Sequence, residues 1–353
     1  MKRAAIIVAF CLLAVTLLAC ERQAPAQPQV PSATNTTPPA VASPQRQPFK
    51  GIYGMKGVGI ELPQSDFIDM KNAGIDILST EWGMEEDVAK TRKFLDQAQA
   101  AGLKVVMDGG FSYTAWGFTD DDWDRLPRGK LPVWQKKRVQ DWVAALKDHP
   151  AICAWDISNE FGENLPDGAD VPGSGWPKGR ITTEQLKQAR ADVLAIDPGR
   201  PIHVRMYAGW DDEKMPSHVK SMLEARIADS ISLNLYSNYL EHGKLEWPTV
   251  IPDMGVAYVS QIKKLSPRSA VWLSIGVFEE AGTFQKPKVA EVNRDMSAAG
   301  KIPGLDGITF FCWGPVDEWD SANHWYLPKN GTDLWTAIKD YMSASREPGI
   351  QGK

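Results

Sequence analysis

Hydrophobic and polar positions follow two alternating patterns along most of the chain. From about residue 50 onward, short runs rich in β-branched and aromatic residues are followed by longer stretches in which apolar residues recur every three or four positions. The first pattern is typical of buried strands and the second of amphipathic helices. Because the two patterns alternate along the chain, they predict repeated strand-helix units. The predicted strands cover residues 51–55, 75–79, 104–107, 152–157, 201–206, 230–235, 270–277 and 307–313.

The segments between these strands predict helices that end at recognisable breaks. Examples are residues 86–101, 133–147, 183–196 and 288–299, and the first of them ends at Ala101-Gly102. Eight such units are enough to close a barrel, so the expected fold class is α/β, a (β/α)8 TIM barrel. The alternative is an open doubly wound sheet, but no Gly-rich phosphate loop follows the first predicted strand, which favours the barrel.

The N-terminal residues have the layout of an export signal. Lys2 and Arg3 precede an apolar run that reaches Ala19, a length too short for a membrane-spanning helix. The run ends Leu-Leu-Ala-Cys at Cys20, which resembles the lipobox of bacterial lipoproteins. This resemblance implies cleavage after residue 19 and a lipid on Cys20; the alternative is an ordinary cleaved signal with an incidental cysteine.

The residues after Cys20 predict a tether rather than a folded unit. Residues 20–49 are rich in Pro, Ala, Gln, Ser and Thr, and contain too few large apolar residues to offset the entropy of ordering. We therefore expect a signal peptide at 1–19, a lipid-anchored linker at 20–49, the barrel at 50–345 and a flexible tail at 346–353. The protein would lie in the bacterial cell envelope, attached to a membrane. Glu21 follows the cysteine, and its resemblance to the sorting residue of lipoproteins in two-membrane bacteria implies the outer membrane.

Composition and charge narrow the function classes. The net charge is −5 and no long basic run is present, which argues against a nucleic-acid partner. The body contains two cysteines, Cys153 and Cys312, without the neighbouring ligands of a metal site, so we expect neither a metal nor another cofactor. The chain contains 14 Trp, and because flat indole faces stack on sugar rings, this number points to a carbohydrate partner.

The stretch 149–160, His-Pro-Ala-Ile-Cys-Ala-Trp-Asp-Ile-Ser-Asn-Glu, places Asn159 and Glu160 at the end of the fourth predicted strand. It resembles strand four of the clan A glycoside hydrolases, which are (β/α)8-barrel enzymes. The resemblance implies that Glu160 is the general acid/base and that Asn159 binds the sugar 2-hydroxyl. Breaking a glycosidic bond requires such a carboxylic acid together with a second carboxylate. The alternative is that Asn159 caps a helix whose first turn contains Glu160.

The second carboxylate of that family is a glutamate at the end of strand seven. Here the candidates are Glu279 and Glu280, which lie several residues beyond Ile275 and Gly276, where the family places its nucleophile. Alternation groups Glu280 with the small residue Gly276, so we favour Glu280 as the inward-facing one. For both glutamates the alternative is an exposed loop edge, in which case the nucleophile has been lost.

Aromatic residues near strand ends are candidates for sugar stacking. Resemblance to the family implies a tryptophan floor at Trp313 and a supporting tyrosine at Tyr236. Trp82, Trp116 and Trp210 follow other strands and either line the cleft or pack inside the protein. For His203 and Arg205 in the fifth strand, a core or paired role is the expected one.

These features leave two main hypotheses. The first is a retaining glycoside hydrolase acting on an oligo- or polysaccharide, with Glu160 and a strand-seven glutamate as its catalytic pair. The second is a surface carbohydrate-binding lipoprotein on a hydrolase-like barrel without a nucleophile. A structural envelope lipoprotein is a third, weaker hypothesis. Several other carboxylates near strand ends could replace the missing base in an inverting reaction; they are Glu81, Asp108, Asp317, Glu318 and Asp320.

Overall fold

The barrel lies within the unit Gln45–Lys353. The computed structural model of the protein describes residues 49–55, 62–80, 87–107, 116–117, 133–158, 181–207, 215, 217–238, 250–280, 284–314, 324–325, 327–328 and 332–344. The predicted signal peptide, the tether apart from Phe49, and the tail therefore lie outside the described residues.

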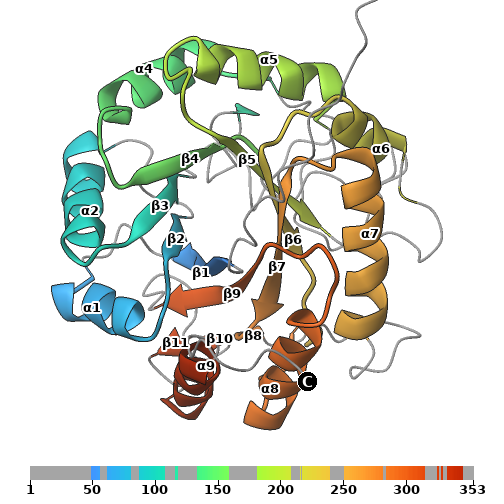
Figure 1. Cartoon of the computed structure of the whole chain (residues 1–353). Helices are drawn as coiled ribbons and strands as arrows, with labels where there is room; N and C mark the ends of the chain where they lie inside the picture. Colours follow the sequence, from blue (N-terminus) through green and yellow to red (C-terminus); the bar gives the residue numbers. More distant parts are fainter. Residues whose placement is uncertain are drawn as a thin grey trace, which may run out of the picture. The chain divides into compact units, whose positions relative to one another are not determined.

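Eight parallel strands form a closed barrel (Figure 1). Each strand pairs with the next one along the chain, and the last long strand pairs with the first, as Phe49 opposite Gly307 illustrates. This closure confirms the predicted (β/α)8 barrel and excludes the open doubly wound sheet. The strands are β1 (Phe49–Met55), β2 (Ile77–Thr80), β3 (Lys104–Met107), β4 (Ile152–Asp156), β5 (Ile202–Tyr207), β6 (Ser230–Asn234), β7 (Ala270–Gly276) and β9 (Gly307–Gly314).

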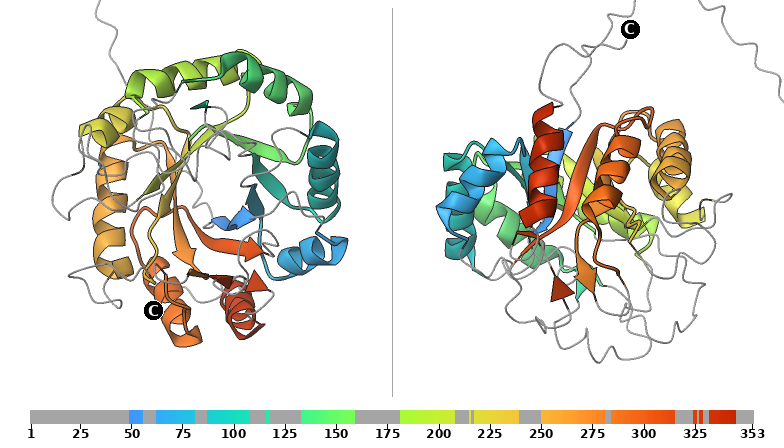
Figure 2. Two further views of the ribbon diagram at one scale, coloured as in Figure 1. Left: turned by 180° about the vertical axis from the view of Figure 1, so that it is seen from behind. Right: turned by 90° about the horizontal axis from the view of Figure 1, so that it is seen from below.

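Helices form a ring around these strands, as seen from both ends in Figures 1 and 2. Local capping explains where some of them begin: Asp87 accepts a hydrogen bond from the Lys90 amide at 2.9 Å, and Thr182 forms a capping box with Gln185. The described helices are α1 (Gln64–Asn72), α2 (Val88–Ala100), α4 (Lys136–Leu146), α5 (Thr183–Leu194), α6 (Ser217–Glu224), the π-helical turn η3 (Val250–Gly255), α7 (Val256–Leu265), α8 (Val289–Ala299) and α9 (Thr332–Ala344).

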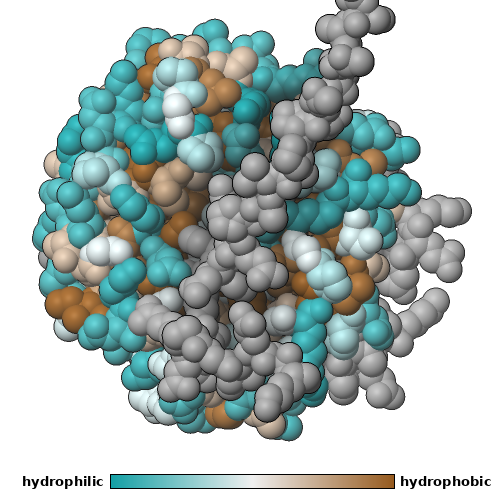
Figure 3. Space-filling model, in the orientation of Figure 1, coloured by the Kyte–Doolittle hydropathy of each residue, from teal (hydrophilic) through white to brown (hydrophobic). Residues whose placement is uncertain are grey.

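The main hydrophobic core lies between the outer face of the barrel and the inner faces of the helices. On β7, for example, Val271, Leu273 and Ile275 belong to this core, whereas the alternating Trp272 and Ser274 do not. The outer surface is correspondingly polar, and hydrophilic residues cover most of the described surface on the face shown in Figure 3. The alternating pattern of the strands and the three-to-four-residue pattern of the helices thus mark the strand and helix faces that meet in this core.

The predicted strands agree with the observed ones to within two residues at each end. Three additional strands of two residues each were not predicted: β8 (Glu279–Glu280), β10 (His324–Trp325) and β11 (Leu327–Pro328). β8 pairs antiparallel with β10, and β11 pairs parallel with β9. Strands of two residues are too short to show a periodicity in sequence.

None of the described helices has the length and apolar character needed to cross a membrane.

Candidate functional site

The site predicted at the carboxyl ends of the strands begins with a buried ion pair between β4 and β5. The Asp156 carboxylate accepts a hydrogen bond from the Arg205 guanidinium, and neither side chain is exposed. The backbone of the two strands continues to pair beyond this point, because the Arg205 amide donates to the Ser158 carbonyl at 2.9 Å. The Ser158 amide also donates to the Asp156 carboxylate at 3.1 Å. The chain is therefore held firmly up to the residue before Asn159.

Small polar residues line the inside of the barrel next to this ion pair. Ser232 and Asn234 of β6, Ser274 of β7 and Thr309 of β9 are all buried, and Ser274 lies in register with both Asn234 and Thr309. In the part of the chain that the structure describes, the Ser232 and Ser274 hydroxyls have no hydrogen-bond partner. Buried hydroxyls normally have partners, so this layer is suited to polar groups supplied by solvent or by a ligand.

The Asn238 side chain fills the space beside Gly276 at the end of β7. A Cβ atom at Gly276 would lie well inside 3.0 Å of the Asn238 amide oxygen, a separation that real Cβ atoms essentially never show. Asn238 follows β6 and is completely buried. No side chain can therefore project from position 276 while Asn238 keeps this conformation.

Glu279 and Glu280, the predicted nucleophile candidates, lie beyond this closed end. They form β8, in which Glu280 is opposite His324 and Glu279 is opposite Trp325 of β10. Glu279 is partly exposed, whereas the side chain of Glu280 lies outside the described residues. The choice between the two glutamates stays open. Figure 2 shows the short strands at the end of the barrel toward which the β7 arrowhead points.

Tyr236 belongs to an aromatic cluster at the end of β6. Its ring stacks on Phe311 at 5.5 Å between centroids and contacts Phe278 and Phe284 edge-on at 5.4 and 5.8 Å. The cluster joins the ends of β6, β7 and β9 with residue 284, and Tyr236 is only 7% exposed. The peptide bond between Phe311 and Cys312 is cis.

Two of the tryptophans predicted to contact sugar, Trp313 and Trp116, are packed inside the protein. Trp313 is 2% exposed and contacts Trp335 of α9 edge-on at 4.9 Å, so its indole is part of the packing around α9. Trp116 is completely buried against Trp134, and its indole N–H donates to the Ile157 carbonyl at 3.2 Å. Sugar stacking by these two residues stays a prediction. Asn159, Glu160, Trp82, Trp210 and Cys20 lie outside the described residues.

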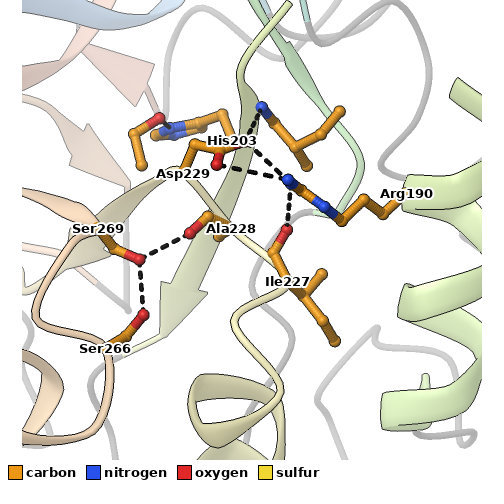
Figure 4. Close-up of polar contacts among 9 residues, drawn as sticks. Arg190, His203, Ile227, Ala228, Asp229, Ser266 and Ser269 are labelled. Atoms are coloured by element: carbon orange, nitrogen blue, oxygen red, sulfur yellow. Dashed lines mark hydrogen bonds and ion pairs between the residues drawn. The ribbon is translucent and has the colours of Figure 1, made fainter. Parts of the chain in front are cut away.

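His203 lies near the start of β5, in register with Asp156 of β4, and its side chain contacts residues near the starts of β6 and β7. Its ring stacks on Trp272, and its Nδ1 lies 2.8 Å from the Ser230 hydroxyl. Burial lowers the pKa of His203 to about 3, so the ring is neutral. Nearby, Arg190 of α5 donates to the Asp229 carboxylate at 2.9 Å (Figure 4). These contacts hold strands together at the end of the barrel associated with stability, which agrees with the expected core role of His203.

Sequence reasoning missed the roles of Asp156, Gly276 and Asn238. Strand alternation could have placed Asp156 on the same face as Glu160, and Arg205 on the inner face of the next strand. No comparable signal exists for Asn238, because it lies in a loop and its partners are 40 and 47 positions away. Among the described residues, no group of three His, Cys, Asp or Glu side chains is placed to hold a metal ion.

No protein-family model and no curated protein sequence matches this chain. Solved structures of glycoside hydrolases share its fold. The GH5_18 protein of Streptomyces cattleya, solved with Manβ1-4GlcNAc, is 19% identical with a TM-score of 0.61, covering 87% of this chain and 83% of its own. The endo-β-1,4-mannanase of Thermotoga petrophila is 14% identical with a TM-score of 0.53, and the match covers 88% of this chain and 79% of the mannanase. A GH42 β-galactosidase of G. stearothermophilus, Gan42B, is 14% identical with a TM-score of 0.55, and the match covers 85% of this chain and 57% of the β-galactosidase.

Proposed function

We propose that the protein is a retaining glycoside hydrolase that cleaves an oligo- or polysaccharide, with Glu160 as its acid/base. The observation that carries this proposal is the geometry of β4. Asp156 and Ser158 are completely buried at alternate positions, and Ile157 between them packs in the outer core. Continued alternation would bring Glu160 to the inner face, one step nearer the mouth of the barrel.

A retaining reaction needs a second carboxylate about 5 Å from the first. Since Asn238 closes the end of β7 at Gly276, this group would come from β8, as Glu280 or Glu279. The pairing of β8 with β10 gives this segment a defined backbone. The catalytic pair would then be Glu160 and one of these two glutamates, with Asn159, Tyr236, Trp82, Trp116, Trp210 and Trp313 as candidate sugar contacts.

The direct test replaces each glutamate by glutamine and measures hydrolysis. The first substrates to test are Manβ1-4GlcNAc, with which the similar GH5_18 protein was solved, and β-1,4-mannan, because another similar structure is an endo-β-1,4-mannanase. Glu160→Gln should lower kcat by about 100- to 10,000-fold and leave the fold intact by circular dichroism. One of Glu280→Gln and Glu279→Gln should cause a comparable loss. Glu184→Gln, on the exposed side of α5, is the matched control. Full activity in Glu160→Gln would reject the assignment.

The stereochemical outcome gives a second test. Proton NMR of the first product should show the same anomeric configuration as the substrate. Inversion would instead point to a more distant base and a water-mediated reaction.

A carbohydrate-binding protein without turnover is the second candidate function. The closed end of β7 favours it, because the position where the resemblance places a nucleophile is occupied by glycine and covered by Asn238. This alternative predicts measurable glycan affinity by calorimetry with no product even after long incubation.

The lipid anchor is a separate proposal that rests on the sequence around Cys20. A lipid there, followed by a polar tether, would hold the barrel close to a membrane of the cell envelope while leaving it free to turn. Metabolic labelling with a fatty-acid analogue should mark the wild-type protein and not Cys20→Ser. Equal labelling of both would exclude Cys20 as the lipidated residue.

A further inference from the structure

One buried residue joins both ends of the segment that contains Glu279 and Glu280. The Asn238 side-chain amide donates to the Phe278 carbonyl at 2.8 Å and to the Gln285 carbonyl at 3.1 Å. The Gln285 amide donates in turn to the Asn238 carbonyl at 2.9 Å. Asn238 therefore takes part in three hydrogen bonds, two donated and one accepted, that tie Phe278 and Gln285, seven positions apart in sequence, to the same residue.

Aromatic packing closes the same loop from another direction. Phe278 and Phe284 contact each other at 4.6 Å between ring centroids, and both contact Tyr236 edge-on. The polar and the aromatic contacts thus converge on the same two ends, just after β6. Glu279 and Glu280 lie inside the closed loop and are further paired with β10.

Gly276 allows Asn238 to occupy this position. A Cβ atom at residue 276 would clash with the amide oxygen of Asn238 and would come within 3.3 Å of the Tyr236 Cβ atom. Glycine at the end of β7 and asparagine after β6 are therefore complementary. The glycine that removes a side chain from the strand end makes room for the residue that holds the following segment.

We propose that Asn238 is the positioning residue for the glutamate that faces Glu160 across the site. This inference rests on the proposed hydrolase function. An amide suits the task because its two N–H donors match two carbonyl acceptors, whereas a carboxylate would face both carbonyls with negative charge. A catalytic group must be held within about 0.5 Å of its working position, and a displacement of about 1 Å costs on the order of 100-fold in rate.

The test compares Asn238→Ala with Asn293→Ala in the full-length protein. Asn293 is an exposed asparagine on α8 and serves as the matched control. Asn238→Ala should lower kcat by about 100-fold with little change in KM, because the sugar contacts remain while the nucleophile is displaced. Asn293→Ala should keep wild-type values for both constants. Wild-type kcat in Asn238→Ala would overturn the inference.

Hydrogen exchange separates positioning from general destabilisation. In Asn238→Ala, backbone amides of residues 279–285 should exchange faster, while those of β4 and β5 keep wild-type protection. Uniformly faster exchange throughout the barrel would show a merely structural role and would overturn the inference. Asn238→Asp, which keeps the shape of the side chain and loses the donors, should reproduce the local effect.

Glu160→Gln measured in parallel distinguishes the two proposals. If Glu160→Gln is inactive and Asn238→Ala is as active as wild type, only the positioning role fails. If Glu160→Gln keeps full activity, the proposed catalytic assignment fails whatever Asn238→Ala does. If the wild-type protein hydrolyses no glycan, the exchange experiment decides alone, and unchanged exchange at residues 279–285 would refute the closure of the loop by Asn238.

Discussion

Asp156 and Arg205 face each other inside the barrel as an ion pair in which neither side chain is exposed to solvent. Asp156 lies four residues before Glu160 in the sequence, and Arg205 lies on the adjacent strand, so the pair joins β4 to β5. Withdrawing two charges from water is costly, and their mutual attraction offsets that cost only while both remain. This relationship makes each of the two residues sensitive to replacement of the other.

Breaking this ion pair should therefore destabilise the protein strongly. Asp156→Asn leaves an uncompensated guanidinium in the core, and we expect the free energy of unfolding to fall by about 3–5 kcal/mol. Chemical denaturation monitored by tryptophan fluorescence measures this change. Asp141→Asn is the control, because it breaks the exposed pair between Lys137 and Asp141 on α4 and should cost about 0.5 kcal/mol or less. Similar losses in the two variants would contradict the burial of the Asp156 pair.

The buried carboxyl group of Asp295 should make the free energy of unfolding depend on pH between about 4 and 7.5. Burial in α8 raises the pKa of this carboxyl from 3.8 to about 6, although Ser237 donates a hydrogen bond to it and Arg294 lies near it. The folded state thus binds a proton more tightly than the unfolded state. The stabilisation associated with the bound proton is complete below about pH 4 and is lost as the pH rises through about 6, a change of about 3 kcal/mol.

Asp295→Asn should remove this loss, because the amide stays neutral at every pH and its oxygen still accepts from Ser237. At pH 4 the variant and the wild type should unfold at similar denaturant concentrations, and at pH 7.5 the variant should be the more stable. Asp340→Asn, on the exposed side of α9, should follow the wild-type curve. A constant difference between Asp295→Asn and wild type from pH 4 to 7.5 would show that Asp295 does not titrate in this range.

Replacing Trp313 and Trp335 distinguishes a packing role of Trp313 from a sugar-binding role. Their rings meet edge-on at 4.9 Å, and both are nearly completely buried. If Trp313 only packs, Trp313→Phe and Trp335→Phe should each lower the free energy of unfolding by about 1–3 kcal/mol and leave glycan affinity unchanged. If Trp313 also forms the sugar floor, Trp313→Phe alone should weaken binding in calorimetry. Trp335, on the outer helix, is the matched control for the loss of an indole.

The sequence determined the elements of the barrel because each strand and helix has its own periodicity. β3, for example, occupies the predicted residues 104–107 without any shift. Hydrophobic alternation records which face of an element is buried, and that information is local to each segment. Eight such units in order were enough to predict the closed barrel, and the motif ending in Glu160 was enough to direct attention to β4.

Only the tertiary structure decided what surrounds those elements. Asn238 meets Phe278 and Gln285 because β6 and β7 are neighbours in the barrel, and the space above Gly276 is filled by a residue from another loop. The pairing of β8 with β10 and of Asp156 with Arg205 likewise joins segments 44 to 49 positions apart. Contacts of this kind depend on where folding brings distant segments, and side-chain periodicity within one segment carries no record of them.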